Sequence, residues 1–301
     1  MALRTFPELD RPAVPEAPGT PAAPATGRLT GVALMLGSAL SNQVGASAGA
    51  LAFPAIGPLG VVAIRQWVAA AMLWATARPK PRAFTPAQWR PVLALALVYA
   101  VMNLTLYTAI DRIGLGLAVT LEFLGPLTVA LASSRRRLDA ACAVVAAAAV
   151  LVLIHPAPST DYLGIGLGLL AAVCWACYIL LNRSIGRRLP GLEGSATAAT
   201  VSALAYVPVG AIWLTFHHPT LAAVGGALAA GVLSSAVPLL CDLLALRRVP
   251  AQFFGMFMSV QPVFAALAGL VILGQQLIWT SWLAIGVIVA VNTVAVRGQR
   301  G

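Results

Sequence analysis

The chain has 301 residues, of which 60% are hydrophobic and 9% are charged, and its mean hydropathy is +0.89. Because a soluble domain carries roughly 25% charged residues, this composition excludes a globular protein that covers its whole surface with polar groups, and it favours a chain dissolved in lipid. The net charge of +10 does not indicate a nucleic-acid partner, since the basic residues stand in short clusters between apolar stretches, which is the pattern of membrane topology.

Residues 1–28 are predicted to form a disordered cytoplasmic tail. Six prolines, at positions 7, 12, 15, 18, 21 and 24, alternate there with alanine, glycine and acidic residues, and such a composition cannot build a packed core. No apolar stretch follows a basic start within this segment. We therefore do not expect it to be a signal peptide.

From residue 29 onward, apolar stretches long enough to cross a bilayer as helices alternate with short breaks. The predicted spans are 29–51, 57–77, 89–110, 115–133, 139–154, 162–182, 195–215, 221–246, 251–273 and 279–296. The fifth span is short, and we expect it to cross with the help of tilt or local thinning of the bilayer. The predicted fold is therefore an all-α membrane protein with ten transmembrane helices.

Basic residues lie on alternate sides of the predicted spans. All but two of the 19 Lys and Arg residues fall in the tail, in the even-numbered breaks or at the C-terminus. The exceptions are Arg65, inside the second span, and Arg112, in the third break. Because cytoplasmic loops of membrane proteins are enriched in Lys and Arg, we expect both termini to be cytoplasmic in a multi-pass protein of a bacterial plasma membrane.

The two halves of the chain resemble each other at an offset of 136 residues. Tyr107–Ser133 aligns without a gap on Leu243–Gly269. The coinciding residues include Arg112 with Arg248 and Pro126 with Pro262. Because a repeat of five helices is odd-numbered, the second copy enters the membrane inverted. We expect two inverted five-helix repeats, residues 29–155 and 156–301, with a substrate site near the midplane between them.

Two carboxylates lie inside predicted spans, Glu122 and Asp242. Burying a charge in a bilayer costs at least ~2.5–3.5 kcal/mol, so such groups usually face a water-filled cavity, pair with another charge or bind protons. We predict that Glu122 binds substrate and that both residues couple transport to protons. Two alternatives stay open: Glu122 is protonated or paired for purely structural reasons, and Asp242 reaches Arg247 or Arg248 by snorkelling.

Arg65 and several polar or aromatic residues are further site candidates. Arg65 either forms an ion pair with Glu122, which lies at a similar depth, or snorkels to the outer interface. Asn103 and Tyr107 share one helix face, and Trp175 and Tyr178 share another. These four residues are predicted to contact the amino or carboxyl group of a substrate, although the aromatic rings also suit packing against lipid.

Prolines inside the spans predict helix breaks. Pro126 has no N–H for the carbonyl of Glu122, and Pro262 has none for Met258. Freed carbonyls at membrane depth are tolerated where they line a cavity, but a plain kink that serves helix packing is an equal alternative. We assign both prolines to helix breaks that could take part in gating.

No motif for an enzyme, a metal site or a bound cofactor is present. Cys174 and Cys177 stand in a C-x-x-C spacing without nearby Cys or His partners, so we interpret them as small apolar helix residues. The sequence contains no P-loop, no H-E-x-x-H and no G-x-S-x-G. A membrane-embedded enzyme or receptor therefore stays a weaker alternative to a carrier, and the direction of transport, uptake or efflux, is left open.

Two stretches and a short motif carry a family resemblance. One stretch is 107–136, which contains Glu122-Phe-Leu-Gly-Pro126, and the other is Ser234–Pro262. Together with Trp175-Ala-Cys-Tyr-Ile179, they are similar to the threonine/homoserine exporter branch of the drug/metabolite transporter superfamily, the EamA-type transporters. The resemblance covers nearly all of residues 29–296.

The resemblance implies ten helices around a central cavity and export of threonine, homoserine or related polar metabolites, driven by exchange for protons. The positions that carry over are Glu122, Gly125, Pro126, Trp175, Tyr178, Pro238 and Pro262. Pro238 is thereby added to the predicted helix breaks. The expected partners are a small polar metabolite, protons and lipid, without nucleic acid and with the oligomeric state left open.

The chain departs from the pattern of this family at three acidic positions. Gln261 precedes Pro262 at a position where such exporters often carry glutamate. At the end of the same helix, this chain has Leu273-Gly274-Gln275 where the superfamily has Leu-Gly-Glu. In the eighth span Asp242 replaces a longer glutamate. We assign Gln261 to substrate binding, since an amide can still bond a polar ligand.

Overall fold

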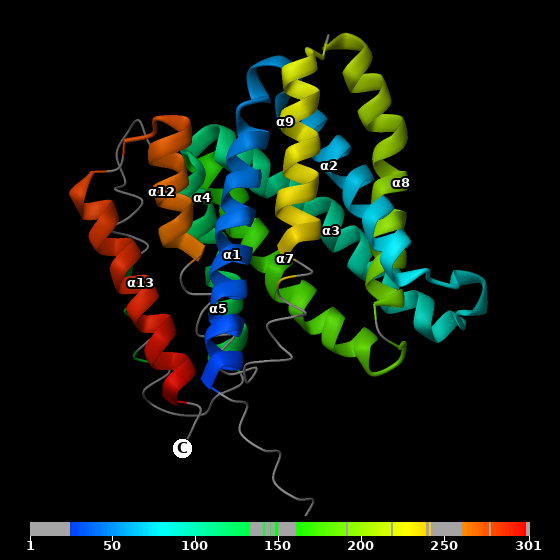
Figure 1. Ribbon diagram of the computed structural model, residues 1–301, viewed down its shortest axis with the longest axis horizontal. Helices are drawn as coiled ribbons and strands as arrows, with labels where there is room; N and C mark the ends of the chain where they lie inside the picture. The colour runs from blue at the N-terminus through cyan, green and yellow to red at the C-terminus, as the bar shows by residue number, and fades with distance from the viewer. Residues whose placement is uncertain are drawn as a thin grey trace, which may run out of the picture.

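The computed structural model describes residues 25–132, 161–190, 192–217, 219–238, 261–276 and 278–298, with the isolated positions 141, 145, 148, 149 and 241. All regular secondary structure in these ranges is helical (Figure 1), so the predicted all-helical class is confirmed for them. The elements are α1 (Ala25–Ala50), α2 (Phe53–Ala77), η1 (Pro81–Ala83), α3 (Pro86–Ile113), α4 (Leu115–Glu122), α5 (Leu124–Ala132), α7 (Tyr162–Gly186), α8 (Glu193–Phe216), α9 (Leu221–Gly231), the π-helix η2 (Val232–Ala236), α12 (Gln261–Leu273) and α13 (Trp279–Gly298).

The described helices lie on the predicted spans. Four of them, α2, α3, α7 and α8, are long and apolar enough to cross a membrane, and shorter apolar helices cover Leu115–Val129, Leu221–Ala236, Gln261–Leu273 and Trp282–Val291. Most of the predicted fifth span and the stretch 242–260, which joins the eighth and ninth, lie outside the described residues, as do residues 1–24 of the predicted tail. The count of ten helices therefore stays a prediction.

Side-chain caps mark where two of these helices begin. Asp161 precedes α7, and its Oδ1 accepts a hydrogen bond from the backbone N–H of Gly164 at 2.8 Å. Thr220 precedes α9 in the same way, and its hydroxyl oxygen accepts from Ala223 at 3.2 Å. Because the first N–H groups of a helix have no partner within it, these local bonds set the start of each helix.

A kink near the start of α2 sets the direction of the rest of that helix. Gly57 has a φ of 65°, a left-handed conformation that residues with a side chain rarely adopt. Pro58 follows it and has no N–H to donate. Nε1 of Trp213, on α8, donates to the carbonyl of Ile56 at 2.8 Å, which satisfies a backbone acceptor beside the break.

The predicted fourth span is divided into α4 and α5 at Phe123. Pro126 causes this division, because it cannot donate to the carbonyl of Glu122, four residues earlier. Gly125 then brings α5 against the backbone of α7, where a Cβ on this glycine would collide with the carbonyl oxygen of Ala172. Close approach at small residues is typical of helix packing in membranes.

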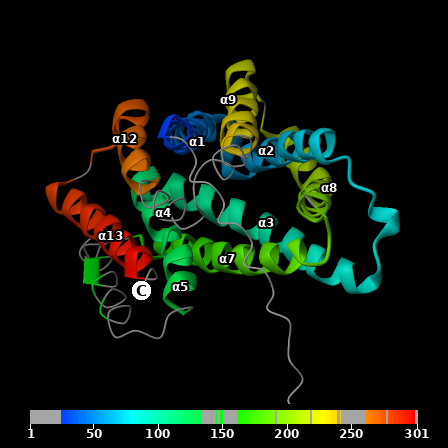
Figure 2. The same ribbon diagram turned by 60° about the horizontal axis from the view of Figure 1, so that its bottom comes forward.

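Helices from the first half of the chain pack mainly on helices from the second half. The α3 helix contacts α7 and α8, α2 contacts α8 and α9, α1 contacts α9 and α12, and α4 contacts α12 and α7. Figures 1 and 2 show α1 standing between α12 and α9, with α13 at one edge of the bundle. This interleaving places the space between the halves at the centre of the molecule.

Candidate functional site

A cavity of about 470 Å³ lies between α1, α2, α3, α4, α7, α8, η2 and α12. This volume is in the range of sites for small molecules, roughly 300–1,000 Å³. Eight of the candidate residues line it: Arg65, Asn103, Tyr107, Glu122, Trp175, Tyr178, Pro238 and Gln261. Pro126 and Pro262 are not among the lining residues, and Asp242 lies outside the residues that the structure describes.

Glu122 is the last residue of α4 and faces this cavity with a side chain that is only 7% exposed. Within the described ranges it has no hydrogen bond or ion pair. The neighbouring Phe123 packs edge-on against Trp175, with 5.9 Å between the ring centroids. The helix break and this ring contact hold the carboxyl group beside the aromatic side of the cavity.

Arg65 also faces the cavity, from the middle of α2. Its Nη1 donates to the side-chain oxygen of Asn103, and its Nη2 donates to the backbone carbonyl of Ser234 at 3.3 Å. The guanidinium carbon lies 5.1 Å from the ring centre of Tyr107, in cation–π range. No ion pair joins Arg65 to Glu122.

Pro238 explains why Arg65 finds a carbonyl at this place. A proline has no N–H, so Pro238 cannot donate to the carbonyl of Ser234, four residues earlier. The preceding turn, η2, is a π-helix, an irregularity that is frequent at functional sites. The carbonyl of Ser234 is thereby open to a donor from outside its own helix, and Arg65 supplies that donor.

Uncharged polar residues complete the lining, and the sequence analysis did not single them out. They include Asn42, Gln43, Gln66, Asn182, Ser195 and Ser234. Nε2 of Gln43 donates to Oε1 of Gln261 at 2.7 Å, and Nε2 of Gln66 donates to the hydroxyl of Ser202 at 2.9 Å. Because polar groups in a membrane must find partners or water, every Asn and Gln inside a predicted span was a detectable candidate.

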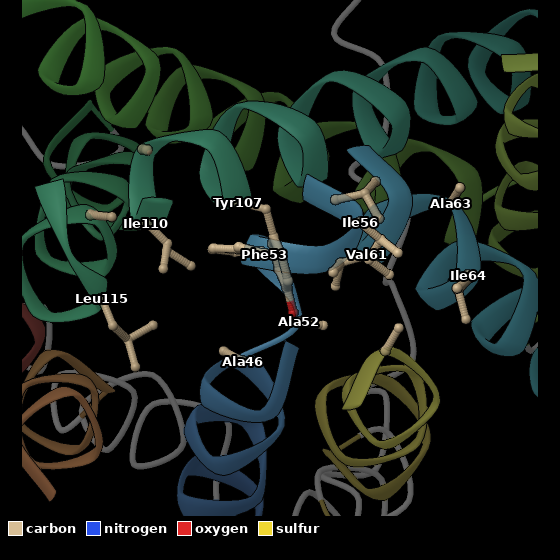
Figure 3. Packing of buried hydrophobic residues seen from close by; sticks show 14 of the residues in the cluster. Ala46, Ala52, Phe53, Ile56, Val61, Ala63, Ile64, Tyr107, Ile110 and Leu115 are labelled. Carbon is tan, nitrogen blue, oxygen red and sulfur yellow. The ribbon is translucent and has the colours of Figure 1, made fainter. Parts of the chain in front are cut away.

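A buried apolar cluster closes one end of the cavity. Phe53 and Tyr107 meet edge-on with 5.9 Å between their ring centroids (Figure 3), and Ile56, Ile110 and Leu115 are at most 2% exposed. Beyond the cluster lies a hollow of about 210 Å³, bounded in part by Phe53 and Ile110. The cluster therefore separates the large cavity from this second hollow.

On the opposite side from this cluster, the cavity extends to the end of the bundle where the breaks rich in Lys and Arg lie. Its lining includes Asn182 and Leu192, on either side of the turn between α7 and α8. Nη1 of Arg188, in this turn, donates to the carbonyl of Ala87 near the start of α3 at 3.0 Å. The breaks before α3 and before α8 therefore meet at the same end of the bundle.

Gln275 lies away from the large cavity. Its Oε1 accepts a hydrogen bond at 2.9 Å from the backbone N–H of Leu115, the first residue of α4. Its own backbone N–H donates to the carbonyl of Gly269 at 2.9 Å. A glutamine here thus caps α4 from the end of α12, a role that an amide oxygen performs as a carboxylate oxygen would.

A family model and known relatives match this chain. The model of the EamA-like transporter family matches residues 162–296. The protein named threonine/homoserine exporter RhtA of Escherichia coli (strain K12) is 36% identical over 279 residues, which cover 89% of this chain and 92% of that protein. The protein of the same name from Salmonella typhimurium (strain LT2) is 36% identical over 270 residues, or 86% and 90% of the two chains.

One crystal structure of a protein aligns with this chain at a TM-score of 0.60 and 19% sequence identity. The alignment covers 91% of this chain and 98% of the other one. At this identity the likeness concerns the fold alone. It shows that the arrangement of helices over nearly the whole chain has a counterpart among solved structures.

Proposed function

Because the chain belongs to the EamA-like transporter family, we propose that it exports small amino acids, such as threonine and homoserine, or related polar metabolites, from the bacterial cytoplasm in exchange for protons. The two relatives named as threonine/homoserine exporters support this substrate class. The architecture that we propose is ten helices in two inverted repeats, residues 29–155 and 156–301.

One observation carries the proposal: the cavity between the two halves combines polar groups with a single carboxyl group, that of Glu122, among its described lining residues. Amides and hydroxyls there can bond an amino acid, while the aromatic rings can pack on its side chain. A carboxyl group that faces a water-filled cavity at membrane depth is a typical element of proton relays in transporters.

Exchange follows if Glu122 holds either a proton or the ammonium group of the substrate, but not both. In the conformation described, the cavity reaches the end of the bundle with the basic breaks, which we assign to the cytoplasm, while the cluster around Phe53 and Tyr107 closes the opposite end. Opening this cluster and closing the other end would present the same carboxyl group to the outside. A proton arriving there would then release the amino acid.

The experiment measures uptake of labelled threonine into inside-out membrane vesicles with and without an imposed pH gradient. Glu122→Gln is nearly isosteric and removes an ionisable group, so the variant should insert and fold but lose transport driven by the gradient. Glu193→Gln is the matched control, because it makes the same change at the start of α8, outside the cavity lining. The control should transport like the parent.

Two outcomes would contradict the proposal in different ways. If Glu122→Gln responds to the gradient like the parent, Glu122 is not the coupling residue, and Asp242 becomes the next candidate. If the parent transports no amino acid from a panel that includes threonine and homoserine, the substrate class is wrong and another polar metabolite must be sought.

A further inference from the structure

The cavity holds one basic and one acidic side chain that do not touch. Among its described lining residues, Arg65 is the only basic one and Glu122 the only acidic one. No salt bridge joins them. The space between them therefore lies between a guanidinium group and a carboxyl group, in surroundings less polar than water, where electrostatic attraction to a charged ligand is stronger.

The partners of Arg65 within the described residues orient its guanidinium group without neutralising it. A guanidinium group has five N–H donors, and here one donates to Asn103 and one to the carbonyl of Ser234. Both acceptors are neutral. Nε of Arg65 is buried and has no hydrogen-bond partner within the described residues. Arg65 thus keeps its full charge and three of its five donors.

The position of the guanidinium group is set before any ligand arrives. Pro238 leaves the carbonyl of Ser234 open to Arg65, and the ring of Tyr107 lies against the guanidinium carbon at 5.1 Å. Contacts from three sides restrict the rotamers of a long side chain, so less conformational entropy is lost when a ligand binds. The planar guanidinium group presents parallel N–H groups along one edge, and a carboxylate can accept two parallel hydrogen bonds from them.

We propose that Arg65 binds the carboxylate of the transported amino acid while Glu122 binds its ammonium group, so that the cavity selects molecules that carry both charges. An amino acid holds these charges on one carbon atom, and it can therefore bridge two protein charges that do not meet. This assignment rests on the proposed export of amino acids and adds to it the residue that rejects amines without a carboxylate. It also makes Arg65 a specificity residue rather than a structural cation.

The first test uses the parent protein in proteoliposomes and measures how well unlabelled compounds inhibit transport of labelled threonine. The probes are threonine, threonine amide and 1-amino-2-propanol, of which the last two lack the carboxylate. Hydrogen bonds between charged groups are stronger than those between neutral groups, so both probes should inhibit at least about tenfold more weakly than threonine. Equal inhibition by threonine and its amide would overturn the assignment.

The second test compares Arg65→Gln and Arg65→Lys with the parent. Arg65→Gln should weaken inhibition by threonine at least about tenfold and leave inhibition by threonine amide within about threefold, because only threonine offers a carboxylate. Arg65→Lys should restore part of the preference, since it restores the charge without the parallel N–H groups. Arg112→Gln removes an arginine outside the cavity lining and should keep the parental preference.

The outcomes separate this inference from the function on which it rests. If the parent transports threonine and Arg65→Gln weakens inhibition by threonine and by threonine amide equally, Arg65 has a structural role. The inference then fails, while the proposed function stands. If Arg65→Gln does not fold, the competition measured with the parent still decides. If the parent transports no amino acid, the proposed function fails and this inference falls with it.

Discussion

Gln43 in α1 and Gln261 in α12 are joined by a buried hydrogen bond, with 2.7 Å between Nε2 of the first and Oε1 of the second. The two residues are 218 positions apart and come from opposite halves of the chain. Both line the cavity, and both are at most 6% exposed. This bond connects helices that must part if one half moves against the other.

We predict that Gln43 and Gln261 are energetically coupled. A double-mutant cycle with Gln43→Ala, Gln261→Ala and the double variant should give a coupling free energy of about 0.6–1.7 kcal/mol, the size measured for interhelical hydrogen bonds in membranes. Reversible unfolding in detergent would measure it. Strictly additive effects of the two substitutions would show that the bond contributes nothing to stability.

Gln275 should stabilise the start of α4. Gln275→Ala removes the acceptor for the N–H of Leu115 and should lower the free energy of unfolding by about 0.5–2 kcal/mol, as for other lost helix caps. Gln275→Glu should be at least as stable as the parent, because a negative charge is favourable at a helix N-terminus. The neighbouring Gln276 is exposed, and Gln276→Ala is the control. Equal effects of the two alanine substitutions would contradict the capping role.

Asp161 should make stability depend on acidic pH. The backbone N–H of Gly164 and the Arg112 guanidinium, 2.9 Å from its carboxylate, lower the pKa of Asp161 in the folded state. The ionised form therefore stabilises the fold above the pKa of the unfolded chain, about 3.9, and this contribution is lost as pH falls through the lowered folded value.

Thermal unfolding in detergent between pH 7 and pH 3 would measure this effect. Asp161→Asn should unfold at a lower temperature than the parent near neutral pH, and the difference should shrink below about pH 4. Asp111→Asn makes the same change at an exposed carboxylate nearby and is the control. A difference between parent and Asp161→Asn that stays constant down to pH 3 would exclude the ionised carboxylate as its cause.

The orientation in the membrane can be checked by cysteine labelling. After the native cysteines are replaced, a cysteine at position 80 or 187 should be protected from impermeant thiol reagents in intact cells, and one at position 158 should react. The hydrogen bond from Arg188 to Ala87 brings two of the basic breaks together, and the Arg112–Asp161 pair joins α3 to the start of α7. The reverse labelling pattern would contradict cytoplasmic termini.

Hydropathy and charge were enough to predict the helices that the structure describes and two of the residues that line the cavity. A transmembrane helix satisfies its own backbone hydrogen bonds, so the limits of α2, α3, α7 and α8 depend mainly on local sequence. Glu122 and Arg65 were recognisable because a charge inside an apolar span is costly. Pro126 likewise predicted the interruption between α4 and α5, since a missing N–H is a property of the residue itself.

The tertiary structure decided which side chains share the cavity and what each of them contacts. Gln43 could have faced lipid, water or another helix, and only the packing of α1 against α12 places it on Gln261. Arg65 could have paired with Glu122 or reached the outer interface. It bonds Asn103 and Ser234 instead, because helices far apart in the chain bring those acceptors to it. Apolarity alone specifies that a helix lies in the bilayer, whereas its rotation depends on partners that only the folded chain assembles.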